Sequence, residues 1–161
     1  METLPQGFEV DRLLQVETNL DDATPETIGY VCERLREAGA LDVWTAPIQM
    51  KKNRPAVLLA LLCDPSQLAV CSEILFRESG AFGLRFHEVT RLKLRRDFVE
   101  VPTPHGTVTI KRGFQGDQLL QSVPEYEACK ALARQSGVPL REIFEAAKQA
   151  AQTVSPCHRA P

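Results

Sequence analysis

The sequence predicts an α+β fold, namely a ferredoxin-like split βαβ sandwich with a β-hairpin extension and C-terminal helices. Three observations predict it. Apolar residues alternate in short segments typical of strands, they recur at helical spacing in two segments between these strands, and the order that results is β-α-β-β-α-β. We therefore expect a core over residues 12–96, a hairpin and two-helix extension over 97–152, and a frayed tail over 153–161.

The first strand and helix follow from residues 13–39. Over Leu13 to Leu20 every second residue is apolar or Thr, which indicates a strand with one core face. Thr24-Pro25-Glu26 then supplies an N-cap, a proline at the first helical position and an acid in the first turn. The helix should end at Gly39.

Two further strands are predicted on either side of a charged turn. LDVWTAPIQM places Trp44, Ala46, Ile48 and Met50 on one side, and KKNRP turns the chain. The next segment, AVLLALLC, is apolar on both faces, which predicts a central strand that is covered on both sides. Asp64-Pro65 then begins a second helix, and GLRFHEVTRLKLRR begins a fourth strand.

The extension is predicted from residues 97 onward. FVEV and TVTIK flank PTPHG and indicate a β-hairpin, followed by a polar loop. Ser122 and Glu125 are spaced as a capping box before a helix that ends near Gly137. PLREIFEAAKQAA predicts a last helix.

Composition narrows the function classes. The formal net charge of −2 argues against broad nucleic-acid binding, and no run of about 18 apolar residues predicts a membrane span. The start METLPQGFEV lacks a secretory pattern. Five cysteines without a C-x-x-C pair indicate neither a disulfide framework nor a zinc ribbon, so we expect a reducing, cytoplasmic location. The tail pair Cys157-His158 is interpreted as part of the frayed end rather than as a metal site.

The predicted topology brings charged loops to one rim of the sheet. In a split βαβ fold the end of strand one, the turn between strands two and three, and the start of strand four meet at the same edge. These are Asp21-Asp22, the turn 51–54, and the segment from Glu78-Ser79 to Arg85. Carboxylates beside cations suit a metal-bound polyphosphate. Ordinary turn chemistry is the alternative for the two acids, and a solvated hairpin turn is the alternative for KKNR.

Other motifs are weaker or absent. The sequence has no G-x-x-x-x-G-K-[ST], no G-x-G-x-x-G and no nucleophile elbow. RLKLRR alternates cations with leucines, which is typical of the solvated face of an outer strand. With 6% aromatic residues, an RNA-binding sheet has little support.

Several blocks resemble one known family. ETNLDDATPE, GALDVWTAPIQMKKNRP, LLCDP, FRESGAFGLR and PEYEAC look like the C-terminal part of the LarC nickel-insertase family, and the resemblance covers residues 12–150. It implies nickel insertion into pyridinium-3,5-bisthiocarboxylic acid mononucleotide in a CTP-dependent reaction. The product would be the nickel-pincer nucleotide cofactor of lactate racemase. The C-terminal part is the one associated with CTP, a divalent metal and oligomer formation.

The resemblance also implies roles for residues. Asp21 and Asp22 would hold Mg²⁺ or Mn²⁺ against the triphosphate, with Asp21 the first choice. The turn residues would bind phosphate, with ribose as a further contact, and the remaining nucleotide contacts would come from the segment after the second helix. The complete nucleotide-binding set is Lys51, Lys52, Asn53, Arg54, Glu78, Ser79 and Arg85. The implied step is nucleotidyl transfer, in which substrate phosphate attacks the α-phosphate of CTP and pyrophosphate leaves.

The chain also departs from the family pattern. Around Ser79-Gly80-Ala81 the family would have a run of hydroxyl residues, and only Ser79 remains. The substantial N-terminal part of the family's full chain, where nickel ligands are expected, is missing, so this chain is either an excised domain or one product of a split gene. We do not expect it to insert nickel alone.

The resemblance also implies a homo-oligomer, a trimer or a hexamer. Two alternatives stay open, a non-catalytic small-molecule sensor and a pure oligomerisation module. PEYEAC leaves open whether Glu125 only caps a helix and whether Tyr126 stacks on a base.

Overall fold

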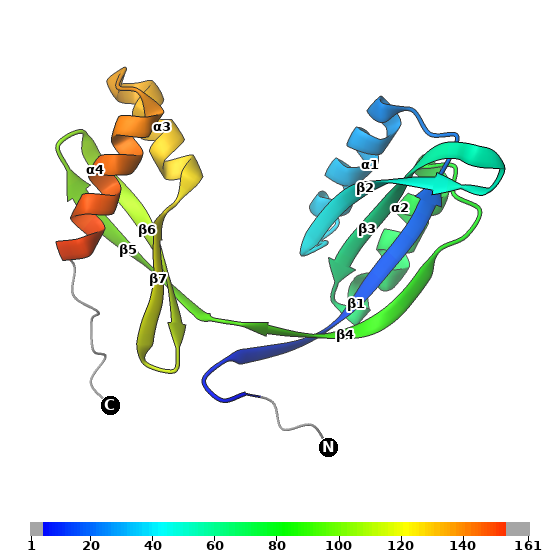
Figure 1. Cartoon of the computed structure of the whole chain (residues 1–161), viewed down its shortest axis with the longest axis horizontal. Helices are drawn as coiled ribbons and strands as arrows, with labels where there is room; N and C mark the ends of the chain where they lie inside the picture. The colour runs from blue at the N-terminus through cyan, green and yellow to red at the C-terminus, as the bar shows by residue number, and fades with distance from the viewer. Residues whose placement is uncertain (1–4, 154–161) are drawn as a thin grey trace. The chain divides into compact units, whose positions relative to one another are not determined.

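The computed structural model describes residues 5–153 and divides into two compact units (Figure 1). The first unit is residues 10–91. The second contains, of the described residues, 5–9 and 92–153. The sequence-based division placed this boundary after residue 96 and did not assign the first eleven residues. The tail expected over 153–161 lies outside the described residues except for Thr153, which ends the last helix.

The first unit has the predicted ferredoxin-like topology. Its elements are β1 (Glu9–Leu20), α1 (Pro25–Glu37), β2 (Asp42–Met50), β3 (Arg54–Cys63), α2 (Leu68–Glu78) and β4 (Arg85–Lys93). The sheet order is β2-β3-β1-β4, and β3 runs antiparallel to both β1 and β2. This is the split βαβ arrangement, so the predicted fold class is confirmed.

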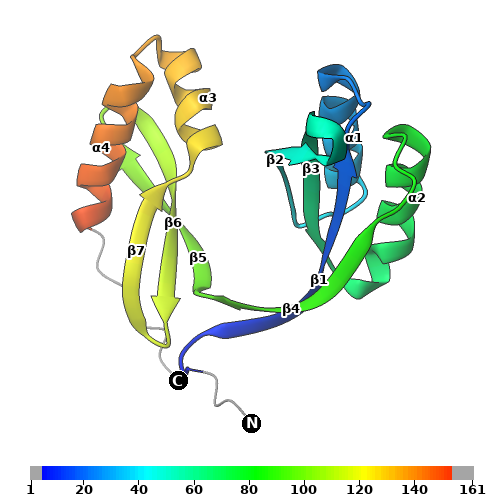
Figure 2. The same ribbon diagram turned by 45° about the vertical axis from the view of Figure 1, so that its right-hand side comes forward.

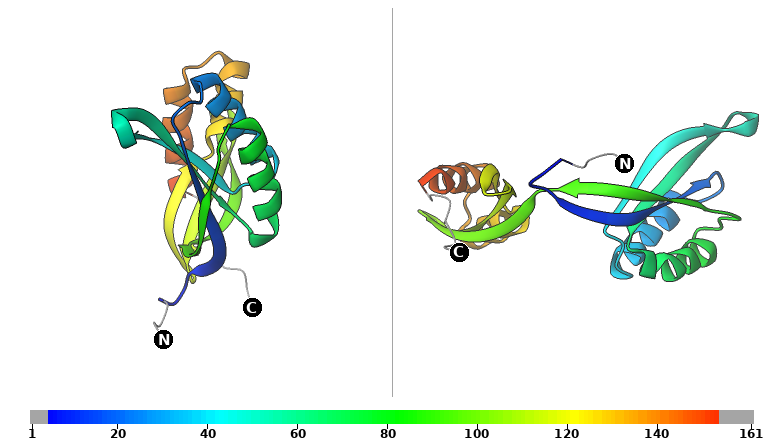
Figure 3. Two further views of the ribbon diagram at one scale, coloured as in Figure 1. Left: turned by 90° about the vertical axis from the view of Figure 1, so that its right-hand side faces the viewer. Right: turned by 90° about the horizontal axis from the view of Figure 1, so that it is seen from below.

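Both helices pack on one face of this sheet (Figure 3). The core is formed by alternate residues of the strands, such as Val16 and Leu61, together with Val31 and Leu35 of α1 and Leu75 of α2. Thr24 caps α1 as predicted, because its side chain accepts a hydrogen bond from the Thr27 backbone N–H at 3.3 Å. The core face therefore follows the period-2 pattern of the strands and the helical spacing between them.

The opposite face of the sheet is covered by no helix of the first unit. Register places Trp44, Leu58 and Leu62 on this face, and their side chains are half-buried. Ala60 lies between them and is fully buried. The prediction that β3 is central is confirmed, while α1 and α2 supply cover on one side only.

The β2–β3 hairpin projects beyond the rest of the sheet (Figure 3). Pairing between β1 and β3 ends at Leu20 and Val57, whereas pairing between β2 and β3 continues to Met50 and Arg54. A 3₁₀ turn over Lys51–Asn53 closes the hairpin. The charged turn is thus held on a two-stranded tip.

The second unit is a three-stranded sheet with two helices packed over it (Figure 2). It contains β5 (Arg95–Thr103), β6 (Gly106–Gln115), β7 (Gln118–Pro124), α3 (Tyr126–Ser136) and α4 (Leu140–Thr153). Its core contains residues of two strands and both helices: Val101, Val108, Ile110, Cys129, Ile143 and Ala147. The hairpin and both helices are confirmed.

Two details of the extension were predicted wrongly. The segment interpreted as a polar loop contains β7, which pairs with β6 through a bulge at Gly113 and Phe114. The predicted capping box does not form, because Ser122 lies within β7 and the N-cap of α3 is Glu125, without a side-chain capping hydrogen bond. Gly137 ends α3 in the left-handed conformation as expected (φ 71°).

Among the residues that the structure describes, no helix combines the length and the apolar character needed to cross a membrane.

Candidate functional site

The acidic end of β1 contacts Arg54, the first residue of β3 after the hairpin turn. Asp21 follows the last residue of β1, and its Oδ2 accepts a hydrogen bond from Arg54 Nη1 at 3.1 Å. The Asp21 side chain is 24% exposed and that of Arg54 is 50% exposed, so the pair is open to solvent on one side. Asp22 is exposed and makes no hydrogen bond or ion pair with other described residues. The predicted meeting of these two loops is therefore present in the structure.

The turn Lys51–Asn53 presents charge in an unusual backbone conformation. Lys52 and Asn53 both have positive φ angles, 61° and 56°. This left-handed region is unfavourable for a lysine, by about 1–2 kcal/mol relative to ordinary backbone. Both lysines are exposed, and within residues 5–153 neither forms an ion pair. Both lysines belong to the turn at the projecting tip of the hairpin.

Arg85 reaches back to β1 from the start of β4. Its Nε donates to Glu17 Oε2 at 2.9 Å, and both terminal nitrogens donate to Asn19 Oδ1 at 3.2–3.3 Å. The pKa of Glu17 is lowered from its ordinary value, first by a hydrogen bond from Gln15 and then by the charge of Arg85. Arg54 and Arg85 thus flank the end of β1.

The loop between α2 and β4 is tied to the sheet by buried hydroxyls. Thr18 Oγ1 donates to the Gly83 carbonyl at 2.8 Å. Ser79 is buried, and its Oγ donates to the Leu75 carbonyl at 2.6 Å and accepts from the Ala81 N–H at 3.2 Å. These contacts fix the loop, while Phe82 at its tip is fully exposed. Ser79 was predicted to contact nucleotide, and the structure gives its hydroxyl two partners within the chain.

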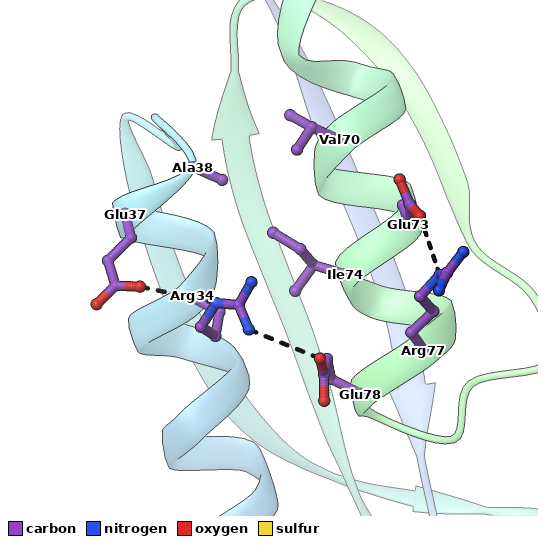
Figure 4. A pocket seen from close by; sticks show the side chains of 8 residues that line it. All are labelled: Arg34, Glu37, Ala38, Val70, Glu73, Ile74, Arg77 and Glu78. Carbon is purple, nitrogen blue, oxygen red and sulfur yellow. Dashed lines mark ion pairs between the residues drawn. The ribbon is translucent and has the colours of Figure 1, made fainter.

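Glu78 is directed toward α1 rather than toward Asp21. Its Oε1 lies 3.7 Å from Arg34 Nη1, and both residues line a cavity between α1 and α2 (Figure 4). This cavity, of about 430 Å³, is lined by two arginines and three glutamates, Arg34, Arg77, Glu37, Glu73 and Glu78, along with apolar residues. We call it the helix groove.

The predicted residues thus divide into three places. Asp21 contacts Arg54 just beyond the end of β1, Asp22 follows Asp21 in the sequence, and Arg85 of β4 contacts Glu17 and Asn19 of β1. Lys51, Lys52 and Asn53 form the tip of the hairpin. Glu78 and Ser79 belong to the end of α2. We use the term rim for the first two groups together.

Sequence reasoning missed several residues that hold the rim and the neighbouring loop in place. Glu17 and Asn19 were assigned only to the polar face of β1, although they hold Arg85. Thr18 was assigned to the core face, where its hydroxyl anchors Gly83. The signal available was the alternation itself, because a hydroxyl on a core face needs a hydrogen-bond partner.

The donor set at the rim suits a hard divalent cation that is shared with phosphate. Within residues 5–153, no group of three or more His, Cys, Asp and Glu side chains is placed to hold a metal ion. Mg²⁺ typically uses one or two carboxylates and completes its shell with water and substrate phosphates. The exposed Asp22 and the open side of Asp21 fit that requirement, whereas a closed transition-metal site would need more ligands.

The second cavity lies in the second unit and is lined by residues of β5, β6 and β7 and of the segment before them. It contains none of the predicted site residues.

Comparison with known proteins identifies the relatives of this chain. A family model described as "Nickel insertion protein" matches residues 3–144. A protein of Syntrophotalea carbinolica that is named for nickel insertion is 48% identical over 147 residues, and one of Pelobacter propionicus is 46% identical over 145 residues. These alignments cover 91% and 90% of this chain, and 37% of each relative. The chain thus spans little more than a third of their length.

Solved structures agree with this relationship. The structure described as "LarC2, the C-terminal domain of a cyclometallase involved in the synthesis of the NPN cofactor of lactate racemase", in its apo form, superposes with a TM-score of 0.86 at 37% identity. The match covers 90% of this chain and all of that one. A protein from Methanopyrus kandleri shares the fold, with a TM-score of 0.59 at 24% identity over 89% of this chain and 90% of that one.

Proposed function

This chain belongs to the nickel insertion protein family, and we propose that it is the part that binds CTP and a divalent metal in a CTP-dependent nickel insertase. The activity of the whole protein would supply the nickel-pincer nucleotide cofactor of lactate racemase, as the name of the matched cyclometallase indicates for that protein. The single observation that supports the assignment is the rim. There Asp21 meets Arg54, while Asp22, Lys51 and Lys52 keep their charges unpaired among the described residues.

The rim residues have distinct roles in this proposal. Asp21 and Asp22 would hold Mg²⁺ or Mn²⁺, which when bound neutralises charge on the triphosphate. Arg54 offers its forked guanidinium to phosphate, because only one of its nitrogens is engaged with Asp21. Lys51 and Lys52 add point charges from the hairpin tip, and Arg85 adds a further cation from β4. The pair Asp21–Arg54 orients both side chains before a ligand arrives.

The chemistry we propose is nucleotidyl transfer. A phosphate oxygen of the mononucleotide substrate attacks the α-phosphorus of CTP, the bond from this phosphorus to the bridging oxygen breaks, and pyrophosphate leaves. Catalysis of such a transfer consists mainly of positioning and of charge stabilisation by cations. Arg54, Lys51 and Lys52 would stabilise the charge on the transferring and leaving groups.

Nickel would enter this reaction as a substrate. No His/Cys/Asp/Glu group of three is present in the described part of the chain, and a borderline metal such as Ni²⁺ prefers nitrogen and sulfur ligands. The nickel ligands are therefore proposed to lie in the part of the relatives that this chain does not span.

Metal-dependent nucleotide binding tests the proposal. Calorimetric titration of the chain with CTP, with and without Mg²⁺ or Mn²⁺, should give binding that needs the metal and that exceeds binding of ATP, GTP and UTP. Absence of binding for all four nucleotides would reject the assignment. Asp21 and Asp22 would then be interpreted as ordinary turn residues.

An assembly role is the second candidate, and the open face of the first sheet favours it. Trp44, Leu58 and Leu62 are only half-buried there, and apolar surface of this kind is typical of contacts between protein molecules. We propose that a second copy of this chain covers the face, as in a trimer or hexamer. Trp44→Glu should then lower the mass measured by light scattering, and an unchanged mass would reject this interface.

A further inference from the structure

The basic segment RLKLRR is distributed among three different environments in the structure. Arg91 belongs to the first unit and forms an ion pair with Asp11 at 2.6 Å. Arg95 in the second unit stacks its guanidinium 4.3 Å from the centre of the Phe114 ring. Lys93 and Arg96 line a cavity of the second unit instead. The segment is therefore more than the solvated face of one strand.

This cavity is small and its lining is positively charged. It has a volume of about 260 Å³ and is lined by Lys93, Leu94, Arg96, Lys111, Arg112, Gly113, Gln121 and Val123. Four of these eight residues are cations, and none is an acid. We call it the basic cavity.

Register explains why these side chains meet. On β5, β6 and β7, the residues Arg96, Gly113 and Gln121 lie side by side, because Arg96 pairs with Gly113 and Gly113 pairs with Gln121. Lys111 and Val123 form the next such row. These residues share the face opposite the helices, since Val108 and Ile110 face the core.

Gly113 leaves space in the cavity because it has no side chain. A Cβ atom at this position would lie 2.8 Å from Leu94 Cδ1 and 3.5 Å from Gln121 Cβ. The missing side chain therefore lets Leu94 and Gln121 approach the backbone of β6.

The cations differ in how far they are neutralised. Arg112 makes a two-fold contact with Asp97, at 2.7 and 2.8 Å, and is nearly buried. Lys93 forms an ion pair with Glu9 at 3.6 Å. Lys111 lies 3.7 Å from Glu125, a distance longer than a good hydrogen bond. Arg96 is exposed and forms no ion pair with another described residue. The cavity therefore retains a positive field that an anion would complete.

We infer that the basic cavity binds the phosphate dianion of a small phosphate monoester. Arg96 supplies a forked donor and Lys111 supplies a point charge, which together suit the terminal oxygens of a phosphate. Leu94 and Val123 give the cavity an apolar wall for the organic part, and the Gln121 amide can hydrogen-bond to a hydroxyl group. The site is separate from the rim and does not depend on the proposed CTP binding.

Calorimetry and NMR on the full chain test the inference. Ribose 5-phosphate is the probe, ribose is the neutral control, and inorganic phosphate separates the ion from the sugar ester. Ribose 5-phosphate should bind and should shift the backbone resonances of Lys93, Arg96, Lys111 and Gln121. Equal affinity for inorganic phosphate would assign the site to phosphate alone, whereas tighter binding of the ester would assign a role to the apolar wall.

Variants assign the binding to the cavity. Arg96→Ala should weaken binding by about tenfold, which is the loss expected for one charge-assisted contact. Lys111→Gln should weaken it similarly, and Arg134→Ala, at an exposed position of α3 in the same unit, should leave it unchanged. Asp21→Ala should also leave it unchanged, which separates this site from the rim. Absent binding, or equal binding by wild-type chain and Arg96→Ala, would overturn the inference.

Discussion

The rim and the helix groove of the first unit differ in how far their charged side chains form ion pairs within the chain. In the helix groove, both arginines are paired: Arg34 lies 3.7 Å from Glu37 and from Glu78, and Arg77 lies 2.9 Å from Glu73 (Figure 4). Two arginines and three glutamates leave a formal charge of −1 there, since 2 − 3 = −1. At the rim, Lys51, Lys52 and Asp22 are unpaired among the described residues.

This difference predicts that the helix groove is a poorer phosphate site than the rim. A phosphate that enters the helix groove meets a net negative charge and must displace existing ion pairs. A phosphate at the rim meets cations whose charge is not yet compensated within the described chain. The extent of charge pairing therefore distinguishes the two places.

Removing the rim carboxylates should have the largest effect. If Asp21 and Asp22 hold the metal, the double variant Asp21→Ala/Asp22→Ala should weaken metal-dependent CTP binding by about 100-fold or more, two contacts of about tenfold each. Calorimetry with and without Mg²⁺ measures this. Asp117→Ala, on the exposed turn after β6, is the control and should bind normally. If the double variant and the Asp117→Ala control bind CTP with equal affinity, the two carboxylates are not part of the site.

The hairpin tip should contribute less, and by charge alone. Lys52→Gly should weaken CTP binding by about tenfold, the loss of one cation–phosphate contact. It should not destabilise the fold. Relief of the left-handed strain, about 1–2 kcal/mol, offsets the backbone entropy of glycine, about 0.5–1 kcal/mol. Urea unfolding and calorimetry on one preparation measure both effects. A variant that unfolds more easily, yet binds CTP normally, would contradict both parts.

Ser79 should matter for the loop beside the rim. Ser79→Ala removes the hydrogen bond to the Leu75 carbonyl and leaves the Ala81 N–H without its partner. A loss of about 1–2 kcal/mol in the free energy of unfolding is expected for such a buried group. Chemical denaturation measures it, and Ser136→Ala, at an exposed position of α3, is the control. Lost CTP affinity at unchanged stability would instead favour the predicted nucleotide contact.

Glu17 should give the first unit a dependence on acid. Its pKa is lowered in the folded chain, first by Gln15 and also by Arg85, so its ionised form stabilises the fold above the ordinary carboxyl pKa. This contribution is lost as the pH falls through the lowered pKa of Glu17. Stability measured from pH 6 down to pH 3 should therefore fall less steeply in Glu17→Gln. An identical slope in both proteins would show that another group carries the acid dependence.

The smallest effect is expected in the helix groove. Arg77→Ala breaks one exposed ion pair with Glu73, which contributes about 0–1 kcal/mol. CTP affinity should stay at the wild-type value. A clear loss of affinity would reverse the comparison and place the nucleotide between α1 and α2.

The sequence predicted the first unit well because its signals are local and repeated. Alternation in β1, the Thr24-Pro25 cap and the doubly apolar β3 each have one strong interpretation, and the order of elements then leaves few topologies. The meeting of Asp21 with the hairpin followed from that topology alone.

The remainder required contacts that no local pattern contains. β7 was missed because Gly116 and Asp117, directly before it, are typical of a polar loop. Ser122 was interpreted as part of a helix cap, although it lies in this strand opposite Arg112. Glu78 was predicted to lie at the rim because it begins the segment that leads to Arg85. Its side chain is instead directed toward Arg34. The direction of a side chain at the end of a helix depends on its tertiary partner, and the sequence does not show this partner.

Resonance mapping of the bound nucleotide tests the central claim most directly. With ¹⁵N-labelled chain, CTP and Mg²⁺ should shift the backbone signals of Asp21, Asp22 and residues 51–54, while those of Arg34, Glu73 and Arg77 keep their positions. Shifts that are confined to the helix groove, with the rim unchanged, would contradict the account.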